Sequence, residues 1–564
     1  MRFRRVRWRV LTLGASILTS VAFAGACGDG EDVQGGRITI GQALAGASLD
    51  PAFAHPGNGD QPAWATESSW LLYTPLLTYR HEQGDAGTEL IPGLAADLPE
   101  VSADGRTYTL TLREGIAYSD GREVQPGDFE ATLKRSLRLQ PQLADQFGVI
   151  QGVDGYVAGG GADADISGID ANGETGEITI RLDSPSASFP NVLAMPPAAP
   201  LPPATPVTDL SSDPPPGVGP YEVVEVTEAG GFVARKSERF ETFDIPDIPT
   251  GNVDRIIARP SVSTRRQTRG VLNNRLDYMQ RPPTTGLKPT IFEQASDRYD
   301  EHATASTFFF YLDHTRPPFD DPRVRAAVNR GIDRGALARA SGGELAPGCS
   351  FIPPGIPGYD EALDLTDCPY GDPTKPPDVE AAREMLRRAG ARGTRVAVWG
   401  SAAAPSRRIT VAYATMLRRL GLRPELRIVP PQVYARAIAR RIPPAQTGLI
   451  GHFQTFPHPL DFYPLVDSRS IRSRDTLNPG GIDDPRIDDE IDRLRLEPDL
   501  EAVAADWAQL DGYLISPEQS HIAPIGHREL ASFFSERMDT DAAIFHPVYF
   551  NDYSSFALKE GEER

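Results

Sequence analysis

The sequence predicts a two-lobed α/β protein, and three observations support this fold class. The chain has 564 residues, which is too long for one hydrophobic core and enough for two or three lobes. Runs in which apolar and polar residues alternate, as in half-buried strands, take turns with runs of helical periodicity. These runs fall into two stretches of the chain. A proline-rich segment from Met195 to Pro216, which suits a crossover or linker, lies between them.

The N-terminus has the features of an export signal. Five arginines precede a run of 17 apolar, small and hydroxyl residues from Val10 to Ala26. Cys27 follows small residues, as in a bacterial lipoprotein box, although Ala24 stands where Leu or Val is usual. We therefore expect a signal peptide over residues 1–26, lipidation of Cys27 and a flexible tether over residues 27–36. The exported protein would then be anchored to the outer face of the cell membrane.

An uncleaved signal anchor is the alternative, because 17 residues approach the lower limit for a membrane-spanning helix. The rest of the chain has no second apolar run of that length, which predicts a soluble body. With 57 basic and 77 acidic residues, the chain carries a formal net charge of −20. This charge argues against nucleic acid as a partner, since phosphate binding needs a basic face. It mildly favours a cationic or neutral ligand.

The elements of the first stretch follow from local patterns. Arg37 to Ile40 reads as a first strand, and a helix is expected from Thr66 until Pro75 interrupts it. Strict alternation predicts strands from Thr107 to Leu112 and from Ile178 to Leu182. Pro126 suits a first helical turn, so we expect a helix to begin there.

The second stretch is predicted in the same way. A strand pair is expected to start with the residues 217–224, and Asp321-Pro322 precedes a segment with one apolar helical face. Asp378 is placed to cap another helix, which Gly390 would end. The segment from Val396 to Val429 reads as strand, helix and strand, the pattern of a βαβ unit.

Two cysteines remain after Cys27, namely Cys349 and Cys368. An even pair in an exported chain predicts a disulfide, which would close a loop of 20 residues counted inclusively. Two free thiols are the alternative. A metal site is less expected, because no histidine lies within this loop.

Several short motifs occur in an order and spacing that single out one family. Most of their residues suit scaffold roles such as turns, and Arg325 and Arg334 read as solvated or salt-bridged helix residues. The ordered set resembles the family 5 extracellular solute-binding proteins, the peptide and nickel class that serves ABC importers. The motifs are Leu49-Asp50-Pro51, Ile91 to Ala95, Ser102 to Leu110 with Leu112 to Gly115, Asp120-Gly121, Asp128-Phe129, Lys134-Arg135, Gly217 to Tyr221, Pro318 to Asn329 with Ile332 to Arg334, and Ala381 to Leu386.

The resemblance implies a periplasmic-binding-protein-like fold of class II, cluster C type, with a hinge between two lobes. Lobe I is then expected over residues 37–303, with a peripheral subdomain over 67–199. Lobe II is expected over 304–515, followed by a return to lobe I over 516–556 and a tail over 557–564. The function implied is capture of a solute between the lobes and its delivery to ABC permease subunits.

One segment departs from the family pattern. Residues 451–462 resemble, without gaps, a Gly-Trp-x-x-Asp-x-x-Asp-Pro-x-x-Phe stretch of oligopeptide and dipeptide binders, in which the first Asp grips the α-ammonium of the ligand. Thr455 occupies the position of that Asp, and a hydroxyl does not compensate a buried ammonium. We expect weak or absent binding of simple di- to pentapeptides unless another acid, such as Asp461, substitutes. The candidate ligand-binding residues are His452, Phe453, Gln454, Thr455, Asp461 and Trp64.

Other functions receive little support from the sequence. His452 and His458 are six residues apart, without a third nearby ligand, and His521 with His527 is no more convincing, so we expect no metal. Catalytic motifs are missing, and we expect neither an enzyme nor a cofactor. A peptide or peptide-like ligand leads, with oligosaccharides, opines, chelated nickel, or a sensor or adhesin role as alternatives. We expect a monomer.

Overall fold

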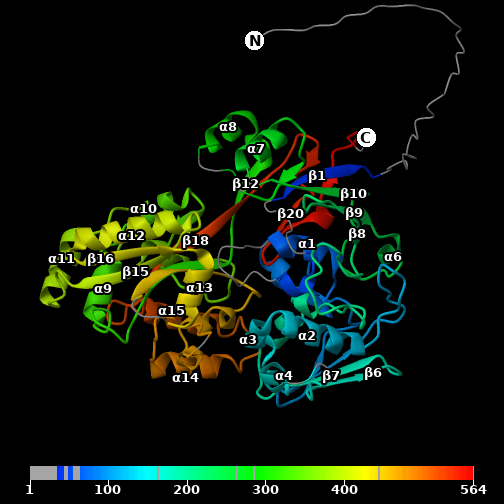
Figure 1. Cartoon of the computed structure of the whole chain (residues 1–564), viewed down its shortest axis with the longest axis horizontal. Coiled ribbons are helices and arrows are strands. Elements are labelled where there is room, and N and C mark those ends of the chain that lie inside the picture. The colour runs from blue at the N-terminus through cyan, green and yellow to red at the C-terminus, as the bar shows by residue number, and fades with distance from the viewer. Residues whose placement is uncertain are drawn as a thin grey trace, which may run out of the picture.

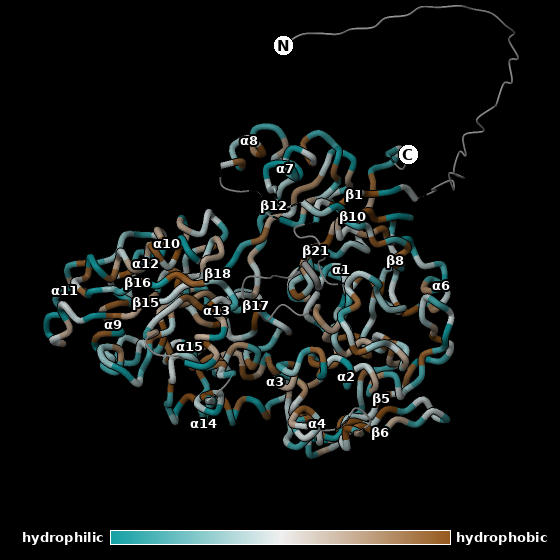
Figure 2. Tube along the Cα trace, in the orientation of Figure 1, coloured by the Kyte–Doolittle hydropathy of each residue, from teal (hydrophilic) through white to brown (hydrophobic). Residues whose placement is uncertain are grey.

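The computed structural model describes residues 35–42, 49–54, 64–159, 161, 164–261, 263–281, 283, 286–441, 445–473 and 475–562. The predicted signal peptide, Cys27 and most of the predicted tether lie outside these residues. Within the described ranges, no helix is both long and apolar enough to cross a bilayer. The chain forms two lobes that lie side by side, and hydrophobic stretches alternate with hydrophilic ones along the elements of each lobe (Figures 1 and 2).

Lobe I is built on a five-stranded sheet with the order β11-β1-β10-β9-β8. Strand β1 pairs in parallel with β10 and β11, whereas β9 pairs antiparallel with β10 and β8. Its core also takes in helix α1 and residues near the C-terminus, so both ends of the described chain lie on this lobe. The elements are β1 (Arg37–Gln42), α1 (Trp64–Leu72), β8 (Tyr221–Val226), β9 (Phe232–Lys236), β10 (Arg255–Pro260) and β11 (Tyr278–Met279).

Shorter elements complete lobe I. Three pairs of short antiparallel strands, β2 with β3, β19 with β22, and β20 with β21, accompany three helices. Their bounds are β2 (Leu77–Tyr79), β3 (Leu90–Pro92), α6 (Glu238–Glu241), α7 (Thr264–Leu272), α8 (Lys288–Gln294), β19 (Met538–Asp539), β20 (Ile544–His546), β21 (Phe550–Asp552) and β22 (Ala557–Leu558).

A second unit with its own sheet and core adjoins lobe I, and we refer to it as the peripheral unit. Its four antiparallel strands have the order β4-β5-β7-β6, and the strands predicted from alternation are β5 and β7. One large core joins this sheet to the helices beside it and also takes in β2, β3 and α6 of lobe I. The elements are β4 (Glu100–Val101), β5 (Thr107–Thr111), α2 (Gly127–Leu139), α3 (Ala144–Phe147), α4 (Val153–Gly159), β6 (Ile169–Asn172), β7 (Glu177–Arg181) and α5 (Phe189–Val192).

Lobe II contains a mixed sheet with the order β12-β18-β13-β17-β15-β16, and β14 pairs with β18. Helices α9 to α12 pack against one core of this sheet, and α14 and α15 against another. The elements are β13 (Ser306–Leu312), α9 (Pro322–Gly331), α10 (Arg334–Ser341), β14 (Leu345–Pro347), α11 (Val379–Arg388), β15 (Arg395–Ser401), α12 (Ser406–Leu420), β16 (Arg423–Val429), α13 (Pro431–Ala439), β17 (Thr447–Phe453), α14 (Pro485–Leu494) and α15 (Ala504–Ile515).

Two neighbouring antiparallel strands connect the lobes: β12 (Tyr299–Ala303), which runs into β13, and the long β18 (Ile522–Phe533). The first half of β18 pairs with β13 in lobe II, and its second half pairs with β12 as the chain approaches lobe I (Figure 1). Two crossing strands are a suitable hinge for lobe closure. The predicted limits at residues 303/304 and 515/516 stay predictions.

A buried ion pair fastens the peripheral unit to lobe I. The guanidinium of Arg135, on α2, donates to both carboxylate oxygens of Asp50, at 2.9 and 2.6 Å. Both side chains are almost completely buried. The backbone N–H groups of Ala52 and Leu210 also donate to Asp50, which gives this carboxylate donors from three segments. Bidentate geometry with additional donors is the arrangement in which a buried ion pair offsets its desolvation.

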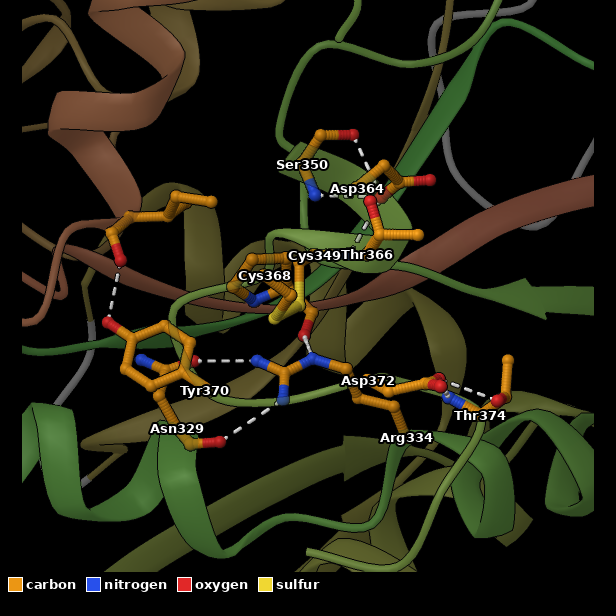
Figure 3. Close-up of a disulfide and its surroundings, with 12 residues drawn as sticks. Asn329, Arg334, Cys349, Ser350, Asp364, Thr366, Cys368, Tyr370, Asp372 and Thr374 are labelled. Atoms are coloured by element: carbon orange, nitrogen blue, oxygen red, sulfur yellow. Dashed lines mark hydrogen bonds between the residues drawn. A yellow bond between two sulfur atoms is a disulfide. The ribbon is translucent and has the colours of Figure 1, made fainter. Parts of the chain in front are cut away.

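The expectation for Arg325 and Arg334 is wrong, because both side chains are buried and neither is paired with a carboxylate within the described residues. Arg325 donates to the carbonyl oxygens of Phe319, Gln519 and Ser520. Arg334 donates to the Pro524 carbonyl and to both oxygens of Asn329 (Figure 3). Burial lowers the pKa of each guanidinium to about 10. Carbonyl oxygens satisfy the donors, so these arginines fasten α9 and α10 to the start of β18.

Candidate functional site

A large cavity lies between the peripheral unit and lobe II. Its volume is about 1770 Å³. Typical pockets for drug-sized ligands are about 300–1,000 Å³, so this space suits a larger solute. Most residues of the segments 141–149 and 183–188 contribute to one wall, and several loops of lobe II form the other.

The topology of lobe II explains why these loops converge. Strand β15 pairs in parallel with both β16 and β17. The carboxyl ends of parallel strands meet at one edge of a sheet, where α/β proteins commonly bind ligands. Residues 402–406 follow β15, α13 follows β16, and residues 454–461 follow β17. All three segments contribute to the cavity wall.

Three of the candidate residues meet at this wall: His452, Thr455 and Asp461. The backbone N–H and the hydroxyl of Thr455 donate to the two carboxylate oxygens of Asp461, at 2.6 and 2.5 Å. The Nε2 atom of His452 lies 3.2 Å from the same carboxylate. Asp461 therefore lies beside the position where the related binders carry their Asp, and local donors already engage both of its oxygens.

Two of the other candidates, Phe453 and Gln454, do not line the cavity. Phe453 is fully buried in the core of lobe II, with its ring edge-on to Phe308. Gln454 donates its side-chain amide to the Pro547 carbonyl in lobe I, so it bridges the lobes. Trp64 begins helix α1, and its side chain lies outside the described part of the structure.

The histidines singled out in the sequence have other partners. His458 is buried, its Nδ1 accepts from the backbone N–H of Leu460, and burial lowers the pKa of its imidazole to about 3. His521 lies 3.1 Å from Asp484. Across the described residues, no three or more His, Cys, Asp or Glu side chains are grouped so that they could hold a metal ion.

The structure adds a charged pair that the sequence motifs do not indicate. Arg528, on β18, and Glu344, which precedes β14, both line the cavity and form an ion pair of 2.7 Å. The Nε atom of Arg528 is buried and has no hydrogen-bond partner among the described residues, and the guanidinium carbon lies 5.4 Å from the centre of the Phe453 ring. The pairing of β14 with β18 brings together residues 184 positions apart, which no local pattern in the sequence reveals.

Two contacts bridge the cavity walls away from the hinge. The guanidinium of Arg472, in lobe II, lies 3.0 Å from the Asp145 carboxylate on α3. The backbone N–H of Ala187 donates to the Arg495 carbonyl at 3.2 Å. Burial raises the pKa of the Asp145 carboxyl, although the nearby Arg472 opposes the shift. The peripheral unit and lobe II therefore touch across the cavity.

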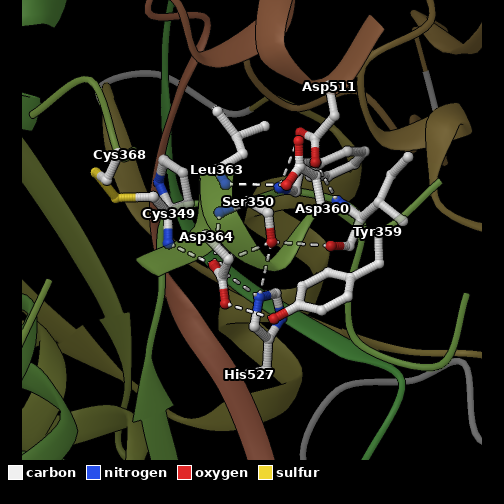
Figure 4. A network of polar contacts seen from close by, with 12 residues as sticks. Cys349, Ser350, Tyr359, Asp360, Leu363, Asp364, Cys368, Asp511 and His527 are labelled. Carbon is white, nitrogen blue, oxygen red and sulfur yellow. Dashed lines mark hydrogen bonds and ion pairs between the residues drawn. A yellow bond between two sulfur atoms is a disulfide. The ribbon is translucent and has the colours of Figure 1, made fainter. Parts of the chain in front are cut away.

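The predicted cysteine pair is present as a disulfide on lobe II. Cys349 and Cys368 are bonded, with their Cα atoms 5.9 Å apart (Figure 3). Within the loop that it closes, Ser350 and Asp364 contact His527 of β18 at 3.0 and 3.3 Å (Figure 4). Burial alone would raise the pKa of the Asp364 carboxyl, but contacts with His527 and Ser350 hold it at about 2.

This Ser–His–Asp cluster does not have the arrangement of a hydrolase triad. The Nε2 atom of His527 faces both Ser350 and Asp364, and its Nδ1 faces the Ser306 carbonyl at 2.8 Å. All three side chains are buried, and none lines the cavity. The cluster therefore attaches the disulfide loop to the hinge strand.

Comparisons with known proteins agree with this architecture. The model of the family described as bacterial extracellular solute-binding proteins, family 5 Middle, matches residues 89–470. The glutathione-binding protein GsiB of Escherichia coli strain K12 is 29% identical over 323 residues, which are 55% of this chain and 56% of that protein. The match thus spans little more than half the length of this curated relative. The oligopeptide-binding protein OppA of Bacillus subtilis strain 168 is 22% identical over 396 residues, 68% of each chain.

Solved structures extend the likeness to nearly the whole chain. The clavulanic acid biosynthesis oligopeptide binding protein 2 is 24% identical, with a TM-score of 0.81 over 93% of this chain and 96% of that one. The binding protein AgaA from A. tumefaciens R10, in complex with agropinic acid, is 18% identical, with a TM-score of 0.68 over 93% and 99%. At these identities the similarity shows a shared fold.

Proposed function

This chain belongs to the bacterial extracellular solute-binding proteins of family 5, and we propose that it is the substrate-binding component of an ABC importer. In this proposal it captures a peptide or peptide-like solute between its lobes and presents it to the membrane permease. It acts as a carrier without a catalytic step or cofactor.

The observation that carries the proposal is the cavity of about 1770 Å³, whose walls come from two bodies joined by crossing strands. A site divided between two bodies couples ligand binding to closure of the two bodies around the ligand. A membrane partner can then bind the closed conformation selectively. The names of the relatives, glutathione-binding and oligopeptide-binding protein, support a peptide-like cargo.

The test has two steps. Mass spectrometry after acid release identifies what co-purifies with the native protein, and small-angle scattering then follows the purified chain with and without that compound. We expect a one-to-one complex that is more compact than the ligand-free protein. A protein that binds no peptide-like compound and keeps its dimensions with every candidate would contradict the proposal.

Ligand capture is expected not to depend on a free amino terminus. Thr455 replaces the Asp that would pair with an ammonium, and the Asp461 carboxylate already accepts two hydrogen bonds from Thr455. Calorimetry with pentapeptides in free and N-acetylated form should therefore give affinities within about twofold of each other. Loss of an ion pair with the ammonium would be larger, because each 1.4 kcal/mol changes the affinity tenfold.

A tenfold or larger loss on acetylation would mean that a carboxylate grips the ammonium after all. Asp461→Asn would then be the first variant to measure, with Asp467→Asn as a control, because Asp467 also lines the cavity but is paired with Arg469 at 2.7 Å. A loss of affinity for the free-amino peptide in the Asp461→Asn variant alone would show that Asp461 pairs with the ammonium.

We further propose that Arg528 and Glu344 offer the solute a charged contact near the hinge. The Arg528 side chain is largely buried, lines the cavity and is paired there with Glu344 at 2.7 Å. A guanidinium and a carboxylate side by side suit a solute that carries both an acceptor and a donor.

We propose that lipidation of Cys27 anchors the protein to the membrane. The basis is the lipoprotein-like sequence around Cys27. Fractionation of cells expressing Cys27→Ala should find the protein released from membranes. Retention of that variant with Met1 intact would show that the N-terminus is a transmembrane anchor instead.

A further inference from the structure

The charge of this protein is distributed very unevenly. From Asp378 to Arg441 the chain has 14 arginines, no lysine and four acids, a local net charge of +10. The whole chain has a net charge of −20, so the remaining residues carry −30. One segment of lobe II is therefore strongly basic within an acidic molecule.

Eight of these arginines gather at one end of lobe II, where α11 and α12 finish and β15 and β16 begin. We call this end the basic tip. Residues Arg395 and Arg423 are neighbours in the paired strands, Gly393 N–H donates to the Gly421 carbonyl at 2.7 Å, and Arg383 donates to the Arg419 carbonyl at 2.8 Å. The eight side chains are exposed: Arg383, Arg387, Arg388, Arg392, Arg395, Arg418, Arg419 and Arg423.

Local acids account for only part of this charge. Glu380, Glu384 and Glu425 form ion pairs with four of the eight arginines. The other four, Arg392, Arg418, Arg419 and Arg423, have no carboxylate at ion-pair distance among the residues that the structure describes.

Stabilisation of helix ends explains the presence of some of the eight arginines. Four of the eight arginines lie in the last turns of α11 and α12, where the helix dipole favours cations. Helix ends do not explain Arg392 or the neighbouring pair of Arg395 and Arg423, whose like charges oppose each other.

Ligand capture does not explain the basic tip either. None of its eight arginines lines the interlobe cavity. The tip is the end of lobe II farthest from lobe I (Figure 1). The charge of the basic tip is spread over the ends of four elements. On β16, the edge strand of the sheet, Leu426 is 39% exposed. Planar guanidinium groups bind phosphate oxygens in pairs, which suits a surface of many phosphates.

We propose that the basic tip docks on an anionic phospholipid bilayer. Each arginine near such a surface contributes attraction, while the acidic remainder of the molecule is repelled. The protein would therefore approach the membrane with the tip of lobe II first. This inference does not depend on the proposed transport function or on the identity of the solute.

The test compares two triple variants of equal charge. One is Arg418→Gln/Arg419→Gln/Arg423→Gln at the tip. The other is Arg265→Gln/Arg266→Gln/Arg269→Gln, three exposed arginines of α7 on lobe I. All proteins carry Cys27→Ala, so that no acyl chain at this residue contributes. Binding is measured by flotation with phosphatidylglycerol-containing vesicles and with phosphatidylcholine vesicles at about 50 mM salt.

We expect the parent protein to bind the anionic vesicles at least about tenfold better than the neutral ones, and salt to abolish the difference. The tip variant should lose roughly tenfold or more of this binding, and the α7 variant less than about twofold. Equal binding to both vesicles, or equal losses in both variants, would overturn the proposal. Unchanged vesicle binding of the tip variant with slower solute uptake in cells would assign the tip to a protein partner and likewise overturn it.

Discussion

Replacing Arg135 with methionine is expected to lower the free energy of unfolding by about 3–5 kcal/mol. The substitution keeps most of the side-chain volume but leaves the Asp50 carboxylate buried without its cation. It also removes the contacts of the guanidinium with the carbonyl groups of Pro206 and Thr208, which fasten the proline-rich crossover to α2. Urea denaturation followed by circular dichroism measures the change.

A matched control is available on the surface. Arg387 and Glu384 form an ion pair on α11 in which both partners are substantially exposed. Arg387→Met should cost less than about 1 kcal/mol, because solvent screens such a pair. If Arg135→Met also cost less than about 1 kcal/mol, the interpretation of Asp50 and Arg135 as a structural link between lobe I and the peripheral unit would be wrong.

Removal of the disulfide by Cys349→Ala/Cys368→Ala is expected to destabilise the protein by about 3 kcal/mol, since the bond closes a loop with a sequence separation of 19 residues. The loop also carries Ser350 and Asp364, whose contacts with His527 reach the hinge strand. Loosening the loop should therefore increase amide hydrogen exchange in β18 as well as lower the unfolding midpoint.

The wild-type protein under reducing conditions provides the control, because it retains both cysteine side chains. Its unfolding midpoint should fall to that of the double variant. Peptide mapping without reductant checks the premise, and recovery of two free thiols would remove the explanation altogether.

Local patterns in the sequence were sufficient for many elements. The strict alternation of residues 107–112 and 178–182 corresponds to β5 and β7, because one face of each strand is buried. Asp378 caps α11 through the backbone N–H of Ala381 at 2.9 Å, as its position before an apolar periodic segment indicated. The predicted βαβ unit is β15, α12 and β16, with the two strands parallel. In each case the structure depends on residues that are close together in the sequence.

The order of the motifs indicated the family, and the fold followed from the family. The chemical roles of the motif residues did not follow. Asp50 and Arg135 belong to separate motifs, and only the packing of α2 against lobe I makes them a buried pair. Arg325 and Arg334 looked like surface residues, but α9 and α10 pack against β18, and carbonyl groups of β18 and of the segment before it accept hydrogen bonds from the two arginines. An arginine is predicted on the surface unless its partners are known, and backbone carbonyls leave no signature in the sequence.

The same distinction holds for the candidate site. The sequence identified the segment after β17 as the one that departs from the peptide binders, and His452, Thr455 and Asp461 do line the cavity. It did not reveal that Thr455 holds Asp461, that Phe453 faces the core, or that Arg528 and Glu344 line the same space. Periodicity and caps act over a few residues and can be read along the chain. The cavity depends on strand pairing between segments up to hundreds of residues apart, which is decided only when the two lobes fold and meet.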